Sequence, residues 1–218
     1  MWGNIQAMRV AEIFYSMSGE GQSSGLPSTF IRFAGCNFSE EGHPCSYCDT
    51  PQAWYRNQGK EMTEEEIVTE VSKFPAKHVI LTGGEPLAQD CVSLVYRLIS
   101  SDYKVEIETN GSISIKKWPL NHTIWSLDIK CPSSNNDEYN RYDNLKLLRK
   151  RDQVKFICQD RENFDFALDV LLKYPTKAQV FFQSVWDKLD PKELSEWIKK
   201  DYPVGRLGLQ IHKVLGVR

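Results

Sequence analysis

Residues 29–48 read TFIRFAGCNFSEEGHPCSYC, and they join an apolar, β-branched run to three closely spaced cysteines. The run at residues 29–33 predicts a strand. Cys36, Cys45 and Cys48 follow it directly, so they should lie beyond the carboxyl end of that strand. Functional groups gather at this end in sheets of parallel strands. The placement therefore favours a site, rather than a packed core, for these three thiols.

Other short apolar runs predict further strands at residues 78–82, 104–108, 123–128, 153–157, 178–182 and 207–210. Helical patterns fall between several of them. Thr63 and Glu66 form a capping box before an apolar helix face, and comparable helices are expected at residues 90–100, 163–173 and 191–199. Alternating strands and helices require crossover connections and hence a mainly parallel sheet. The sequence predicts an α/β fold whose sheet is either open and doubly wound or curled into a partial barrel.

The length and charge of the chain limit its class. At 218 residues it suits one domain, with a cluster loop at about residues 34–62 and a flexible loop at about residues 131–142, where turn formers bury little. The 27 basic and 29 acidic side chains nearly cancel, so we expect no nucleic-acid partner and no membrane partner. The sequence lacks a signal-peptide pattern and a long apolar run. We expect a soluble, cytoplasmic protein.

The three clustered cysteines allow two metal interpretations. Structural zinc takes four protein ligands, so a zinc site would need His43 beside the thiols. A [4Fe–4S] cubane on three thiolates instead leaves one iron open, where the amino and carboxylate groups of S-adenosylmethionine (SAM) can chelate. Electron transfer into the sulfonium would then yield a 5′-deoxyadenosyl radical. The spacing from Cys45 to Cys48 is typical of such enzymes, whereas the eight residues between Cys36 and Cys45 depart from the usual three.

A second strand end supports the iron–sulfur interpretation. Residues 79–86 read VILTGGEP, a buried strand followed by two glycines, an acid and a proline. Because glycines let a backbone come close to a ligand, this turn can hydrogen-bond the methionyl ammonium of SAM. Polar residues end further predicted strands and indicate a ligand on one rim. They lie at residues 108–111 and 126–130 and at Lys155, Gln183 and Ser184.

Several short motifs of the amino-terminal third form a specific set. They are EIFYS at residues 12–16, GEG at 19–21, GLP at 25–27, FIR at 30–32, GCN at 35–37 and CSYCDT at 45–50. This set resembles the 7-carboxy-7-deazaguanine synthases, which are radical SAM enzymes of the queuosine and archaeosine pathways. The resemblance continues more thinly through residues 82–86, 108–111 and 128–130, Gln183, QIHK at residues 210–213 and the terminal Arg218.

The resemblance implies a reaction, a fold and a set of cofactors. The family rearranges 6-carboxy-5,6,7,8-tetrahydropterin to 7-carboxy-7-deazaguanine by hydrogen abstraction, ring contraction and loss of ammonia. Its fold is a modified, partial TIM-like barrel of about six parallel strands with few helices, and it pairs as a homodimer. The implied cofactors are a [4Fe–4S] cluster, SAM and Mg²⁺, with an electron donor such as flavodoxin or ferredoxin. The product is a precursor for tRNA modification.

The resemblance also carries roles to individual residues. Cys36, Cys45 and Cys48 match the cluster ligands. Arg32 matches the arginine that holds the substrate carboxylate, with a surface salt bridge as the alternative. Thr50 matches the Mg²⁺ ligand, with a turn-capping hydroxyl as the alternative. The remaining matches are Met17, Ser18, Gly19, Glu20, Thr82 and Arg218 for substrate, and Tyr47, Gly84, Glu85, Glu108, Ser126, Asp128, Lys130 and Gln183 for SAM.

Some features depart from the family pattern or allow another function. Ser18 stands where glutamine is frequent, and Asp128-Ile129-Lys130 stands where Ser-Pro-Lys is frequent, so their roles stay open. His212 is given no role, and Cys91, Cys131 and Cys158 are interpreted as core or loop thiols. The alternative functions are a glycyl-radical-enzyme activase with the same SAM chemistry and a zinc-stabilised binding module without catalysis.

Overall fold

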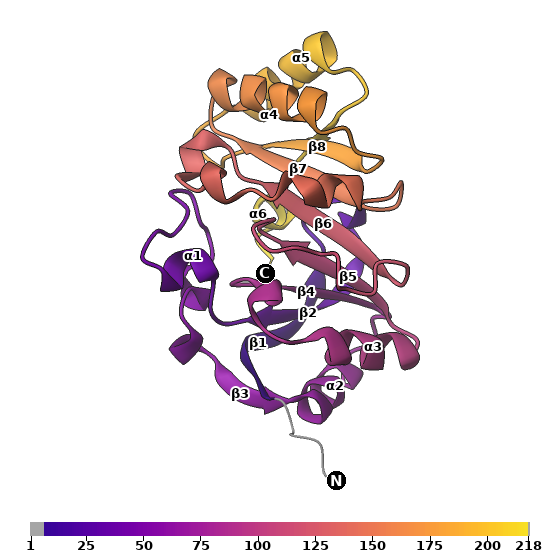
Figure 1. Cartoon of the computed structure of the whole chain (residues 1–218). Helices are drawn as coiled ribbons and strands as arrows, with labels where there is room; N and C mark the ends of the chain where they lie inside the picture. The colour runs from indigo at the N-terminus through magenta and orange to yellow at the C-terminus, as the bar shows by residue number, and fades with distance from the viewer. Residues whose placement is uncertain (1–6, 218) are drawn as a thin grey trace.

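The computed structural model describes residues 7–217, which form one nine-stranded sheet of order β3-β1-β2-β4-β5-β6-β7-β8-β9 (Figure 1). The strands are β1 (Ala7–Met17), β2 (Pro27–Phe33), β3 (Lys60–Thr63), β4 (His78–Gly83), β5 (Lys104–Thr109), β6 (Thr123–Ile129), β7 (Gln153–Cys158), β8 (Gln179–Ser184) and β9 (Arg206–Gly208). The predicted strands are all confirmed, and β1 and β3 are added to them.

The strand directions confirm the predicted mainly parallel sheet. The series β2, β4, β5, β6, β7, β8 and β9 is parallel throughout, which gives seven parallel strands where about six were expected. Strand β1 is antiparallel to both of its neighbours, β2 and β3. The strands β3 and β9 stand at opposite ends of the order, so the barrel is partial and the sheet is not closed.

The helices of residues 7–217 are α1 (Asn37–Glu40), α2 (Glu64–Ser72), α3 (Val92–Ser100), α4 (Arg161–Lys173), α5 (Pro191–Asp201) and α6 (Ile211–Leu215). The predicted capping box is confirmed at α2. The Glu66 amide donates to Thr63 Oγ1 at 3.2 Å, and the Thr63 amide donates to Glu66 Oε2 at 2.7 Å. Asp160 and Asp190 are the N-caps of α4 and α5, where each side chain accepts a hydrogen bond from a backbone amide of the first turn.

The connections before and after β6 contain no α-helix, which fits the reduced number of helices expected for a modified barrel. The connection from β6 to β7 contains only short 3-10 helices, at Pro132–Ser134, Asp137–Tyr139 and Tyr142–Lys146. The segment at residues 131–142, predicted to bury little, nevertheless has Cys131, Ser134 and Asn136 fully buried. They are buried because the segment packs against the cluster loop, where the side-chain nitrogen Nδ2 of Asn136 donates to the His43 carbonyl at 3.1 Å.

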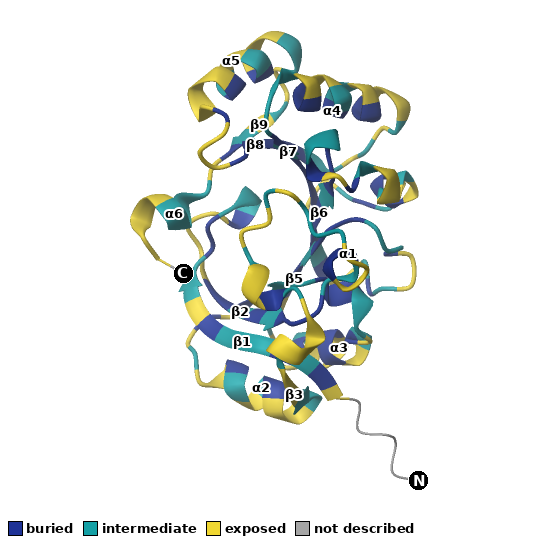
Figure 2. Ribbon diagram, turned by 90° about the vertical axis from the view of Figure 1, so that its left-hand side faces the viewer, coloured by how far each residue is buried: buried dark blue, intermediate teal, exposed yellow. Residues whose placement is uncertain are grey.

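The core lies between the sheet and the helices that cover its outer face. Figure 2 shows the sheet-facing sides of α3 and α4 as buried, and the largest fully buried side chains include Trp125, Phe33 and Phe156. Cys91, Cys131 and Cys158 are also fully buried, as predicted for core thiols, whereas Cys36, Cys45 and Cys48 are at least partly accessible.

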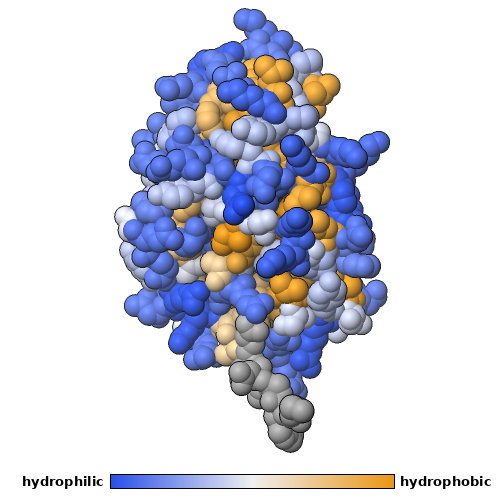
Figure 3. Space-filling view, viewed as in Figure 1, coloured by the Kyte–Doolittle hydropathy of each residue, from blue (hydrophilic) through white to orange (hydrophobic). Residues whose placement is uncertain are grey.

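The face of the molecule seen in Figure 3 carries mostly hydrophilic side chains. Figure 3 shows apolar residues on one face only in small groups among hydrophilic ones. Within residues 7–217, the helices are all too short or too polar to span a lipid bilayer.

We expect Leu94→Ala on α3 to lower the free energy of unfolding by about 2–5 kcal/mol, because Leu94 is fully buried and its removal leaves a cavity. Leu172→Ala on α4 is the matched control. Leu172 is 83% exposed, so its loss should change that free energy by roughly 0.5 kcal/mol or less. Urea unfolding of both anaerobic proteins measures the difference, and equal midpoints would contradict the assignment of the α3 core face.

Candidate active site

Two adjoining cavities open at the carboxyl ends of the parallel strands, with volumes of about 660 and 640 Å³. Both cavities are lined by residues from β4, β5, β6 and β7, so the strand ends meet on one rim as predicted. The residues that line both are Glu20, Asp49, Thr50, Thr82, Glu108, Asp128, Lys155 and Lys213.

The cluster loop lies over the first cavity, which Cys36, Cys45 and Cys48 all line. Backbone bonds hold this loop: the Gly84 amide donates to the Phe33 carbonyl at 2.9 Å, and the Glu85 amide donates to the Gly35 carbonyl at 3.0 Å. A Cβ on Gly84 would lie 2.4 Å from the backbone of Gly35. Gly84 is therefore required for the contact between the β4 turn and the cluster loop, in addition to any approach to a ligand.

The three thiols fit a cubane better than a single metal ion. Among residues 7–217, no group of three or more His, Cys, Asp or Glu side chains converges closely enough for one ion. The Nδ1 atom of His43 lies 2.7 Å from Asn136 Oδ1, and its Nε2 atom lies 3.3 Å from Glu41 Oε2. A Cys3His zinc centre is thus not assembled. A cubane binds its thiolates through separate irons, so sulfurs that line one cavity without converging on a point suit it.

Two polar atoms in the wall of the first cavity are buried without a partner among the described residues: Gln183 Oε1 and Tyr47 Oη. A buried polar atom normally has a hydrogen-bond partner, so these two side chains have hydrogen-bonding capacity that the protein does not use. Gly84 and Lys130 line the same cavity. Six of the eight residues predicted to contact SAM therefore line this cavity beside the cysteines, namely Tyr47, Gly84, Glu108, Asp128, Lys130 and Gln183.

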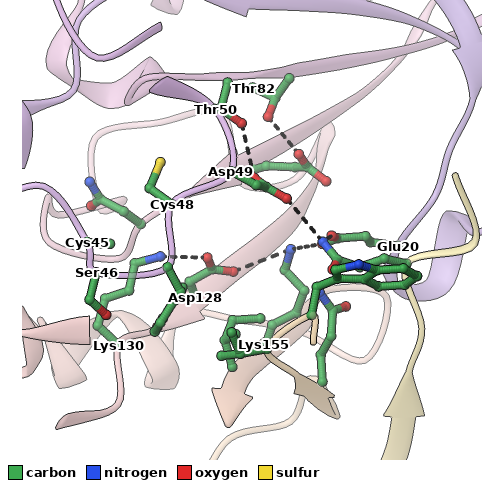
Figure 4. Close-up of a pocket in the computed structure, with 18 of the residues that line it drawn as sticks. Glu20, Cys45, Ser46, Cys48, Asp49, Thr50, Thr82, Asp128, Lys130 and Lys155 are labelled. Carbon is green, nitrogen blue, oxygen red and sulfur yellow. Dashed lines mark hydrogen bonds and ion pairs between the residues drawn. The ribbon is translucent and has the colours of Figure 1, made fainter. Parts of the chain in front are cut away.

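A chain of ion pairs between two buried lysines and two half-buried carboxylates lies in the wall between the two cavities (Figure 4). Lys155 Nζ lies 2.9 Å from Glu20 Oε2 and 3.5 Å from Asp128 Oδ1, and Lys130 Nζ lies 2.9 Å from Asp128 Oδ2. Burial acts to raise the pKa of Asp128, but Lys130 and Lys155 outweigh it and the pKa is lowered. Burial likewise opposes ionisation of Glu20, and Lys155 reverses the effect, so the pKa of Glu20 is lowered. These four groups form a charged wall.

Glu108 differs from its charged neighbours. Burial raises the pKa of Glu108 to about 7, although Lys155 acts to lower it. Its Oε2 atom accepts a hydrogen bond from Thr82 Oγ1 at 2.7 Å. Thr82 and Glu108 therefore form a second pair on the wall shared by the cavities.

The second cavity is lined by Met17, Ser18, Gly19, Glu20 and Arg32, residues for which the resemblance implies contacts with substrate. Arg32 Nε donates to Glu12 Oε1 at 2.9 Å, with side chains only 18% and 22% exposed, so the pair forms part of the cavity wall. Next to it, Phe14 and Phe30 stack at 4.9 Å. A Cβ on Gly19 would lie 1.9 Å from His212 Nδ1, which explains the glycine at that position.

Two predicted site residues, Glu85 and Ser126, lie outside the two cavities. Glu85 is fully buried behind the first cavity and accepts hydrogen bonds from the amides of Leu87 and Asn110. Burial raises its pKa to about 7. Ser126 Oγ accepts from Gln153 Nε2 at 2.8 Å, inside the barrel and below the rim. Neither Glu85 nor Ser126 lines either cavity, and Arg218 lies outside the described residues.

The carboxyl-terminal segment closes the site and was given no such role from the sequence. Gln210 Nε2 donates to Glu20 Oε1 at 2.7 Å, and Lys213 Nζ lies 2.8 Å from Asp49 Oδ2. The Ile211 amide donates to the Gly19 carbonyl at 3.0 Å. The segment therefore fastens the turn after β1 to the loop that follows Cys48. Thr50 in that loop makes no capping bond with its hydroxyl, which instead donates to Asp49 at 3.2 Å.

The sequence model of the Radical SAM superfamily matches residues 30–149. This match, the partial barrel and the three clustered cysteines together define a radical SAM enzyme. The 7-carboxy-7-deazaguanine synthases of Methanospirillum hungatei and Clostridium acetobutylicum are 37% and 35% identical over 96% and 95% of this chain, and over 86% and 95% of their own lengths. The chain belongs to the 7-carboxy-7-deazaguanine synthase family, and the predicted resemblance is confirmed. A [4Fe–4S] cluster and SAM are the cofactors of this class.

The crystal structure of QueE from Escherichia coli has the same fold, with a TM-score of 0.76 and 21% sequence identity over 94% of each chain. The prediction of a modified partial barrel is therefore confirmed by a solved structure as well as by the strand order.

We expect Lys213→Met to speed hydrogen exchange of the Ile211 amide by up to about fivefold, because the partly exposed ion pair with Asp49 contributes roughly 0.2–1 kcal/mol to holding the segment. Hydrogen exchange read by mass spectrometry on peptides that cover α6 measures it. Lys200→Met, at the exposed end of α5, is the control and should leave that exchange unchanged. Equal exchange in both variants would mean that the ion pair does not hold the segment.

Proposed function

We propose that this protein is a 7-carboxy-7-deazaguanine synthase that converts 6-carboxy-5,6,7,8-tetrahydropterin to 7-carboxy-7-deazaguanine with loss of ammonia. The single observation that carries the proposal is the identity of 37% over 96% of the chain with a protein of that name. The two joined cavities support it, since one suits SAM beside the cysteines and the other suits a small polar substrate. A large partner-protein surface, as a glycyl-radical activase needs, has no comparable support.

The residues that line each cavity indicate which ligand it would bind. When bound, the cluster and SAM supply the radical that abstracts hydrogen from the substrate. Arg32 would hold the pterin carboxylate, because its planar guanidinium forms directional, charge-assisted bonds. Phe14 and Phe30 give that pocket an aromatic side against which a flat ring system can pack. Glu20, Thr82 and Ser18 would orient the polar edge of the ring.

Thr50 is proposed as the protein ligand of Mg²⁺. Its hydroxyl lies on the wall shared by both cavities and is not used to cap the following turn. Mg²⁺ prefers hard oxygen ligands and keeps several waters, so a single protein hydroxyl together with the substrate carboxylate suits it. The ion would orient the substrate between Thr50 and Arg32 and withdraw charge from its carboxylate.

Further features of the enzyme are proposed from the family. The whole chain would act as one domain, because residues from Met17 to Lys213 line the two cavities. Flavodoxin or ferredoxin would deliver the electron, and two chains would form a homodimer. Light scattering coupled to gel filtration tests the dimer, which a single-chain mass at micromolar concentration would exclude.

The test of the function is direct. Anaerobically reconstituted protein is incubated with SAM, a reductant and the carboxytetrahydropterin, with and without Mg²⁺, and the deazaguanine is sought by mass spectrometry. Formation of 5′-deoxyadenosine without any deazaguanine would keep the radical class but reject the assigned substrate.

We expect Arg32→Lys to raise the KM for the pterin by roughly ten- to hundredfold, since a hydrogen bond to a charged group contributes about 1.5–3 kcal/mol and lysine cannot form the paired geometry. Steady-state kinetics at saturating SAM measure the effect. Arg161→Lys on the exposed side of α4 is the control. An unchanged KM in Arg32→Lys would show that Arg32 does not bind the pterin carboxylate.

We expect Thr50→Val to increase the Mg²⁺ concentration needed for half-maximal turnover by at least about tenfold, because valine keeps the side-chain volume but has no oxygen ligand. Turnover measured across a Mg²⁺ titration gives the value. Thr69→Val on the exposed face of α2 should leave the titration as in the parent protein. If both variants respond alike to Mg²⁺, the ion is held by other groups.

A further inference from the structure

Each of the three cluster cysteines has a side-chain N–H group directed at its sulfur. Trp54 Nε1 donates to Cys48 Sγ at 3.1 Å, and Asn136 Nδ2 donates to Cys45 Sγ at 3.6 Å. Asn110 Nδ2 lies at the longer distance of 3.9 Å from Cys36 Sγ. The three donors come from separate parts of the chain: the end of the cluster loop, the β6–β7 connection and the turn after β5.

The asparagine donors are held in place by bonds of their own. Asn136 is fully buried, and its Nδ2 atom also donates to the carbonyls of His43 and Ser134, at 3.1 and 3.2 Å. Asn110 Nδ2 donates to Asn37 Oδ1 at 2.9 Å. Both amides are therefore fixed beside the sulfurs, although neither donates to sulfur alone.

Trp54 is held by the backbone of the cluster loop and by its neighbour. Its carbonyl accepts from the Cys36 amide at 2.8 Å, which ties it to the first ligand. Its ring meets Tyr55 edge-on, with centroids 6.3 Å apart. The indole nitrogen has one hydrogen, so the bond to Cys48 uses the whole donor capacity of the side chain. Trp54 is thus the donor of the three that is directed at sulfur alone, and it has the shortest distance.

An N–H···S bond acts on the electron affinity of a cluster. The donor draws electron density away from the thiolate, so less negative charge reaches the iron, and the reduced cluster is stabilised relative to the oxidised one. Hydrogen bonds to the sulfurs are accordingly one of the factors that set the potentials of iron–sulfur clusters. The effect weakens as the bond lengthens.

We propose that Trp54, Asn136 and Asn110 tune the reduction potential of the [4Fe–4S] cluster upward, and that Trp54 contributes most. The step concerned is the uptake of one electron from the external reductant by the cluster, with no bond made or broken in the protein. These residues act through the thiolates and are tuning residues, not catalytic ones. The inference needs only the cluster of the radical SAM class, so it does not depend on which substrate is used.

The test is a redox titration of the anaerobically reconstituted full chain, monitored by the electron paramagnetic resonance signal of the reduced cluster, without SAM or pterin. In Trp54→Phe we expect the ratio of reduced to oxidised cluster at a fixed applied potential to fall about tenfold, which corresponds to a shift of about 59 mV for one electron. The control is Trp197→Phe, the same substitution on α5, where the ring packs against Phe164. It should leave the potential unchanged.

A second protein separates the hydrogen bond from the packing of the ring. β-(3-Benzothienyl)alanine placed at position 54 keeps the bicyclic shape of Trp54 but has sulfur in place of the N–H. We expect the same tenfold fall in this protein. An unchanged potential with full iron content would overturn the proposal. So would failure of both altered proteins to bind the cluster, because the residue would then be needed for assembly. The pterin assay decides the proposed function separately.

Discussion

Lys155 is the residue on which the arrangement of the site depends. Three half-buried carboxylates, those of Glu20, Glu108 and Asp128, lie close together at one rim, and carboxylates partly removed from water destabilise a fold unless a cation lies beside them. Lys155 rises from β7 between them and is itself 5% exposed. Its bond to Glu20 also fixes the turn after β1 against the barrel. Lys155 therefore stabilises both sides of the wall shared by the two cavities, because it pairs with Glu20 and with Asp128, and Lys130 adds a second pair with Asp128.

The parallel strands could be predicted from sequence and the two antiparallel ones could not. Parallel strands are covered on both faces, so they read as continuous apolar runs such as VILTG before Glu85. Strand β1 carries Arg9 and Glu12 and has a bulge between Val10 and Glu12, which breaks its alternation. Strand β3 has four mostly polar residues and exists because β1 offers it an edge. Such pairing is a property of the tertiary fold.

Some residues of the candidate site could likewise be predicted from the sequence, and others could not. The cysteines and the Gly-Gly-Glu-Pro turn could be found because their chemistry is local in sequence. Glu85 and Ser126 sit at or near predicted strand ends, yet their side chains point into the protein, and periodicity does not reveal that direction. The contacts of Gln210 with Asp49 and of Asn136 with Cys45 join residues 161 and 91 positions apart. Lys155 did have a local signal, a single cation within an apolar strand.

The segment at residues 131–142 shows why polar composition is a poor guide to exposure. It has few apolar side chains, but hydrogen bonds hold it: the Ser46 amide donates to the Ser134 carbonyl at 3.3 Å, and the amide side chain of Asn140 exchanges two bonds with the backbone of Lys130, each 2.8 Å long. One end of the segment thus contacts the cluster loop, and the other fixes Lys130, which lines the first cavity. Lys130 also pairs with Asp128. Both charged residues of Asp128-Ile129-Lys130, which stands in place of the family's Ser-Pro-Lys, therefore belong to this hydrogen-bond and ion-pair network. A displacement of this segment would therefore move Cys45 and the charge of Lys130 beside the first cavity together.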